Sequence, residues 1–203
     1  MITFIIMTLF VVISPGIDTA LITKRTIAEG RNAGFQMAFG IAAGSLAHTL
    51  AATLGLSALL LQSAIAFNLV KWVGAIYLIY LGIVAFLPKK STHIQEKQLI
   101  KKHKSAFQEG LFSNLLNPKV AVFFLTFLPQ FVTNADRITF DLLLMGSTYA
   151  LLSIIWFIVY VICLHFIREW LLAPSVQNWI EKTTGIVLVG FGVRLLFVKA
   201  DVS

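Results

Sequence analysis

The chain has 203 residues, of which 58% are hydrophobic and 12% are charged, and its formal net charge is +7 at pH 7. Soluble domains carry about 25% charged residues, so this composition and a mean hydropathy of +0.88 exclude an ordinary soluble fold. In a membrane protein a positive balance reflects loop topology, and we therefore expect an all-α integral membrane protein with no nucleic-acid partner.

Six apolar runs are long enough to cross a bilayer, which takes about 20 residues of helix. The first run follows no positive charge and stays apolar beyond any cleavage site, so we interpret it as a span and not as a secretory signal. We expect a single transmembrane domain over 1–203, embedded in lipid. The predicted spans cover about 1–24, 37–61, 66–87, 111–131, 139–165 and 183–199.

The first span combines a helix breaker with an acid. Pro15 has no backbone amide hydrogen, and together with Gly16 it predicts a break in the helix. Asp18 follows two residues later, and a charge inside a span is costly unless it has a partner or a function. The sequence therefore predicts a binding site at this break.

The second span carries small residues at helical spacing. Gly40, Gly44 and Gly55 share one stripe of the helix, which predicts close packing against another helix. His48 lies on the same stripe, so we expect it to face the protein interior. Its pKa range suits a proton relay, and a neutral imidazole that packs against a neighbouring helix is the alternative.

Positive charges divide unevenly among the predicted loops. The first, third and fifth loops hold eleven of the sixteen Lys and Arg residues, namely Lys24, Arg25, Arg31, Lys89, Lys90, Lys97, Lys101, Lys102, Lys104, Arg168 and Lys182. By the positive-inside rule these loops are cytoplasmic and both termini lie outside. The long basic stretch 88–110 is interpreted as a cytoplasmic loop, in preference to a nucleic-acid or lipid-binding element.

The fourth span repeats the pattern of the first with the opposite charge. Pro118 predicts a second break, and Lys119 follows it at once in the middle of an apolar run. Asn114 and Asn117 precede the break, and their amides can satisfy freed backbone groups or orient a substrate. Broken backbone beside a buried charge again indicates a binding site.

The second half of the sequence echoes the first. Residues 103 to 111 positions apart correspond, namely Pro15 with Pro118, Gly74 with Gly185, and Gly82 with Gly192. Three spans form an odd number, so two such repeats have opposite orientations in the membrane. We expect inverted repeats over about 1–87 and 111–203, with helix packing at Gly74 and Gly82.

Asp18 and Lys119 together suit a zwitterion. A site of low dielectric has to compensate both charges of an amino acid, and these residues can read its ammonium and carboxylate. The alternative is that the two side chains form a structural ion pair that holds the repeats together.

These motifs resemble those of the LysE/RhtB family of amino-acid exporters. The resemblance runs through Ser14–Pro15–Gly16 with Asp18, the Gly40 and Gly44 stripe, Gly74 to Gly82, and Asn114 to Lys119, which together cover nearly the whole chain. It implies six helices in two inverted repeats, a bacterial cell membrane, and export of small amino acids or related metabolites in exchange for protons. Ile17 departs from the pattern, because the family usually has a second proline there.

Rival classes make different demands on the same residues. A cation or metal-ion transporter is the main alternative, yet it needs clustered acidic, histidine or thiol ligands, and well inside the spans there are one acid and one histidine. Ser45 and His48 lack the turn that a serine nucleophile needs, so we expect no enzyme. No cofactor or metal site is expected, and the oligomeric state stays open.

Overall fold

The computed structural model describes residues 2–62, 64–84, 86, 105–132 and 137–197, and these are helical over nearly their whole length. The segments are α1 Ile2–Ile13, α2 Ile17–Glu29, α3 Arg31–Gln62, α4 Ala64–Val84, α5 Ala106–Leu115, α6 Pro118–Val122, the π-helix η1 Phe123–Phe127, the 3-10 helix η2 Leu128–Phe131, α7 Ile138–Leu172 and α8 Pro174–Phe197. The all-α fold class predicted from composition is confirmed for this part of the chain.

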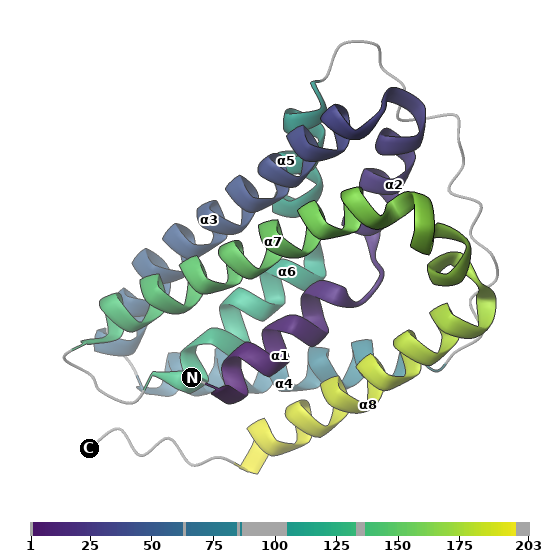
Figure 1. Cartoon of the computed structure of the whole chain (residues 1–203). Helices are drawn as coiled ribbons and strands as arrows, with labels where there is room; N and C mark the ends of the chain where they lie inside the picture. Colours follow the sequence, from purple (N-terminus) through teal and green to yellow (C-terminus); the bar gives the residue numbers. More distant parts are fainter. Residues whose placement is uncertain (1, 63, 85, 87–104, 133–136, 198–203) are drawn as a thin grey trace.

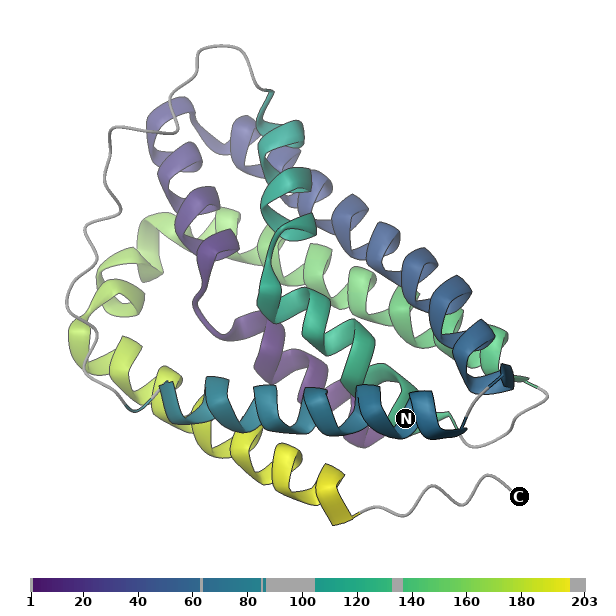
Figure 2. The same ribbon diagram turned by 180° about the vertical axis from the view of Figure 1, so that it is seen from behind.

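The long helices frame two bent pairs. α3 packs along α5 and α7, and α4 packs along α8 (Figure 1). Seen from both sides, α2 and α5 lie at one end of the molecule, while α1 and α6 lie toward the other end (Figure 2). The chain order of a bent pair, a long helix and a shorter helix therefore occurs twice.

The two breaks lie where the prolines predict them. α1 and α2 meet at 53° across residues 14–16, and α5 meets the segment Pro118–Phe131 at 51°. Asn117 caps α6, and Pro118 is the first residue of this helix. At this position an amide hydrogen would have no acceptor within the helix, so proline loses no hydrogen bond there. Local chemistry thus fixes both bends.

Length and hydropathy support fewer spans than the sequence predicts. In the described part of the chain, two helices are long and apolar enough to cross a membrane, over Arg31–Gly55 in α3 and Ile138–Leu164 in α7. If each bent pair counts as one span, the described residues provide up to four. The spans predicted at 66–87 and 183–199 coincide with α4 and α8, and their crossing of the membrane stays a prediction.

The predicted loop 88–110 is too long at its C-terminal end. Its residues 88–104 lie outside the described residues, but 106–110 form the first half of α5. Ser105 and Gln108 start this helix with a capping box, in which each residue's backbone N–H donates to the other's side chain, at 3.2 and 3.3 Å. The polar composition of the segment concealed this signal.

A second correction concerns the loop predicted between 165 and 183. There α7 continues to Leu172, α8 begins at Pro174, and only Ala173 separates them. Proline is well accommodated in the first turn of a helix, so Pro174 permits an abrupt change of direction without a loop.

Small residues let α3 approach the fourth predicted span. A Cβ added at Gly40 would come 2.0 Å from the carbonyl oxygen of Phe107, and one at Gly44 would come 2.8 Å from the Asn114 side chain. The packing role predicted for Gly55 is wrong. Gly55 is exposed, and among the described residues a Cβ there would meet no atom within 4 Å.

Glycines also set the contacts of α4. A Cβ at Gly74 would come 1.9 Å from the Thr126 side chain of η1, and one at Gly82 would come 2.5 Å from Val189 of α8. In return, a Cβ at Gly192 of α8 would come 2.6 Å from a side chain of α4. α4 and α8 therefore approach each other through corresponding glycines.

Candidate functional site

The two helix breaks enclose one pocket, and α7 closes a third side. Its walls come from the α1–α2 break, the α5–α6 break and the middle of α7. The lining residues are Val11, Val12, Ser14, Gly16, Asp18, Thr19, Asn114, Asn117, Lys119, Val120, Tyr149, Ser153 and Phe157. Segments about 100 residues apart in sequence thus form a single site.

Most of the residues singled out in the sequence meet here. Gly16 lines the pocket together with four others of the predicted site, namely Asp18, Asn114, Asn117 and Lys119. Pro15 and Pro118 lie at the breaks beside it without lining it. The prolines shape the backbone, and their neighbours supply the polar groups.

Asp18 receives donors from the other break. It lies in the first turn of α2 and is 7% exposed. Ser113 Oγ donates to one carboxylate oxygen at 2.5 Å. The side-chain amides of Asn114 and Asn117 donate to the other at 3.2 Å each. The buried charge is therefore compensated by three side chains and by the N-terminal end of its own helix.

Lys119 caps the end of α1. Its ammonium donates to the backbone oxygens of Val11 at 3.0 Å and of Ser14 at 3.1 Å. Carbonyls in the last turn of a helix have no helical partner, and a cation there also meets the negative end of the helix dipole. A Cβ at Gly16 would lie 3.4 Å from Lys119 Nζ, so glycine leaves room for the ammonium.

Each break is thus stabilised by the charge of the other half. Lys119 of the second half binds carbonyls freed at the first break, and Asp18 of the first half binds donors at the second. Asn117 also turns its own oxygen to the Lys119 backbone N–H at 3.1 Å, so both ends of its amide are engaged. The breaks are held as a pair.

His48 lies one layer behind the pocket. Its Nε2 is 3.2 Å from the backbone oxygen of Asn114, and it must be the donor because a carbonyl only accepts. The imidazole stacks on Phe124 with ring centroids 5.6 Å apart. Ser45 donates to the Asn114 side-chain oxygen at 3.3 Å. α3 therefore orients the residue that binds Asp18.

The α7 wall was not anticipated from the sequence. Tyr149, Ser153 and Phe157 follow one another at a spacing of four residues, so they form one stripe of the helix. α7 is apolar on most sides, and in the sequence this stripe does not stand out from the exposed apolar residues of the helix. Only two hydroxyl groups at helical spacing could have indicated it.

The pocket is narrow in this structure. It has room for about one water molecule, whereas small-molecule sites usually enclose about 300 to 1,000 Å³. A ligand the size of an amino acid therefore requires the bent pairs or α7 to move apart.

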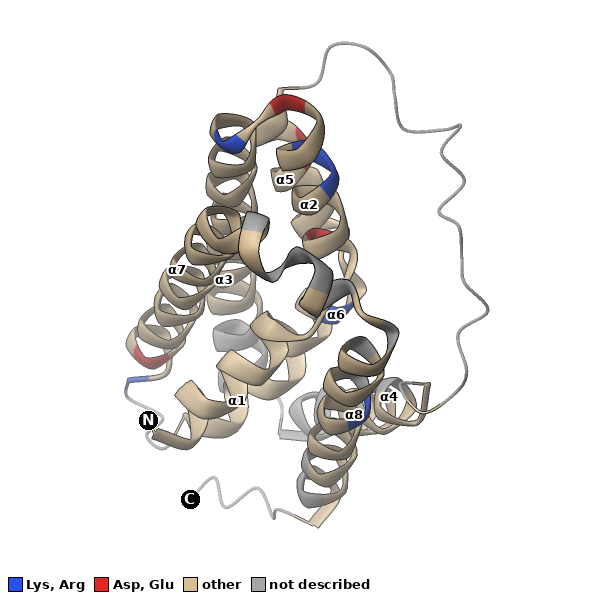
Figure 3. Cartoon of the chain, turned by 45° about the vertical axis from the view of Figure 1, so that its right-hand side comes forward, with Lys and Arg blue, Asp and Glu red and all other residues tan. Residues whose placement is uncertain are grey.

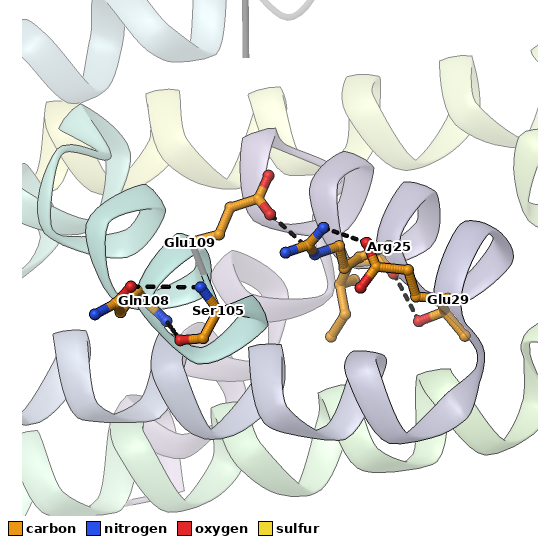
Figure 4. Close-up of polar contacts among 7 residues, drawn as sticks. Arg25, Glu29, Ser105, Gln108 and Glu109 are labelled. Atoms are coloured by element: carbon orange, nitrogen blue, oxygen red, sulfur yellow. Dashed lines mark hydrogen bonds and ion pairs between the residues drawn. The ribbon is translucent and has the colours of Figure 1, made fainter. Parts of the chain in front are cut away.

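An ion pair joins the two half-helices beyond the pocket. Arg25 Nε of α2 lies 3.1 Å from Glu109 Oε2 of α5, and Arg25 also pairs with Glu29 on its own helix (Figure 4). Charged residues gather at this end, and long stretches of the helices carry none (Figure 3). The Arg25 and Glu109 side chains are 23% and 26% exposed, so the pair is partly shielded from solvent.

Comparison with known proteins places the chain among membrane proteins. The family model for LysE type translocators matches residues 9–199. The chain is 36% identical over 192 residues to the uncharacterized membrane protein YrhP of Bacillus subtilis strain 168, covering 90% of this chain and 91% of that protein. It is 26% identical over 188 residues to an uncharacterized membrane protein of Vibrio cholerae, covering 93% and 92%. No solved structure matches significantly.

Proposed function

The chain belongs to the LysE type translocator family, and we propose that it exports amino acids or related small zwitterions from the cytoplasm in exchange for protons. Membership of this family implies transport across a membrane. We propose in addition that the substrate is an amino acid or a related zwitterion, that protons are the coupling ion, and that the long basic loop faces the cytoplasm.

The pairing of opposite charges at the two breaks carries this proposal. The pocket offers a cation, Lys119, for a carboxylate, and it offers backbone oxygens and Asp18 for an ammonium. A free amino acid presents both groups on one carbon atom, so its charges match those of the site. Low dielectric makes such a match selective, because a ligand with one charge leaves the other group uncompensated.

In this proposal the substrate ammonium binds the acceptors that the Lys119 ammonium occupies in the absence of substrate. Its ammonium lies on the Val11 and Ser14 carbonyls, which are also good acceptors for the α-ammonium of an amino acid. When substrate enters, its carboxylate draws Lys119 toward itself and its ammonium replaces Lys119 at the carbonyls. The exchange keeps both carbonyls satisfied, so binding leaves no buried acceptor without a donor.

Proton coupling is assigned to the polar residues that adjoin the substrate. Protonation of Asp18 removes an acceptor for Asn114 and Asn117, so it loosens the contact between the two breaks. The His48 imidazole contacts the backbone oxygen of Asn114 from behind, and an imidazole can carry a proton. Both residues can therefore link protonation to the opening of the bent pairs.

Export is tested in cells that express the chain and are fed dipeptides, with extracellular amino acids profiled over time. Expression should raise the external level of at least one amino acid above a vector control. Lys119→Met should abolish the rise, and Lys182→Met, which removes an exposed lysine of α8, should preserve it. An unchanged profile with well-expressed protein, or full export by Lys119→Met, would refute the proposal.

A further inference from the structure

The α7 wall of the pocket consists of one stripe of side chains. Tyr149, Ser153 and Phe157 all line the pocket, and they are 3%, 2% and 4% exposed. Val11 and Val12 of α1 line the same pocket. This part of the pocket is distinct from the polar part around Asp18, because it presents aromatic and aliphatic surface with two hydroxyl groups.

The two hydroxyl groups have no partner in the described part of the chain. The structure gives no hydrogen bond to Tyr149 Oη or to Ser153 Oγ there, although both residues are more than nine-tenths buried. By contrast, Tyr160 and Thr23, which lie nearer the end of α2, bond to each other at 2.6 Å. Both residues line the pocket, so their hydroxyl groups are available to a ligand or to water that enters it.

Charge limits what this wall can accept. Asp18 is the only acid among the pocket-lining residues, and its oxygens already receive Ser113, Asn114 and Asn117. A basic side chain on the substrate would add a second cation without a second acid. An acidic side chain would add a second carboxylate for which Lys119 is the only cation lining the pocket. Either charge would be buried without compensation.

We infer that Tyr149, Ser153 and Phe157 form the side-chain subsite of the transported amino acid, and that it selects uncharged side chains of limited size. This inference rests on the proposed function and adds the class of substrate. Ser153 is the smallest residue of the stripe and lies between Tyr149 and Phe157 in the helix, so a substrate side chain meets the least bulk there when the pocket opens.

Counterflow into proteoliposomes with the purified full-length protein tests this selectivity. Alanine, leucine, lysine and aspartate serve as labelled probes. Alanine and leucine should exchange at least about tenfold faster than lysine and aspartate. The charged side chain of lysine or aspartate would lie uncompensated in the pocket. Lysine or aspartate exchange as fast as that of the neutral probes would overturn the inference and leave the proposed function standing. Failure of all four probes would overturn both.

Matched variants of α7 test whether the pocket-lining residues set the substrate selectivity. Ser153→Val should lower the ratio of leucine to alanine exchange about tenfold by narrowing the subsite, and Phe157→Leu should raise it. Ser147→Val and Phe140→Leu make the same changes at exposed positions of the helix and should keep the wild-type ratio. Equal effects of Ser147→Val and Ser153→Val would refute the assignment. If a pocket variant fails to reach the membrane, the wild-type probe comparison still decides.

Discussion

Replacing Asp18 and Lys119 singly and together tests whether the two charges support different helix breaks or simply each other. Asp18→Asn keeps the shape of the side chain but puts an amide donor among three donors, so at least one hydrogen bond to a charged acceptor is lost. Such a bond is worth about 1.5 to 3 kcal/mol. Lys119→Met leaves the Val11 and Ser14 carbonyls without this donor, at about 1 to 3 kcal/mol each.

Because the two residues bond to different partners, the two losses should largely add. We expect each single variant to lower the melting temperature of the detergent-purified protein by about 5 to 15 °C. The double variant should be less stable than either single variant. A direct ion pair predicts the opposite, since removing both charges of such a pair restores much of the stability. Recovery of the double variant to near the wild-type melting temperature would refute the reciprocal support of the breaks.

The remaining predictions concern packing, titration and topology. Gly40→Ala should strongly reduce the amount of folded protein, because the added Cβ would come 2.0 Å from a backbone oxygen. Gly55→Ala should not, because its Cβ would meet no described atom, and fluorescence-detected gel filtration compares the two variants. His48→Gln keeps a donor for the carbonyl oxygen behind the pocket and removes titration, so export should become less dependent on pH, and an unchanged pH profile would leave only a packing role. A cysteine placed in 88–104 should react with an impermeant label only after permeabilisation, and labelling of intact cells would reverse the predicted orientation.

The sequence by itself determined the features that depend on local chemistry. Hydropathy indicated a helical membrane protein, and Pro15 and Pro118 marked both breaks because a proline inside a long apolar run has no amide hydrogen to continue the helical hydrogen bonds. A charge in a long apolar run is conspicuous for the same reason, so Asp18 and Lys119 could be predicted as site residues before their surroundings were known.

The start of α5 shows where even local signals are weak. The capping box of Ser105 and Gln108 is present in the sequence, but it directly follows a run of lysines that is typical of a loop. At Gly55, regular spacing suggested a contact that the packing of the described residues does not provide.

Tertiary structure alone decided which partners the charges have. Asp18 bonds to side chains 95 to 99 residues away, and Lys119 bonds to carbonyls 105 and 108 residues away. Every residue has a backbone carbonyl, so no residue type marks the ones that a distant lysine will cap. The α7 wall was equally hidden, since a helix that is apolar on nearly all sides shows no periodic pattern. Only the packing of α7 against the breaks separates Tyr149, Ser153 and Phe157 from the residues that face outward.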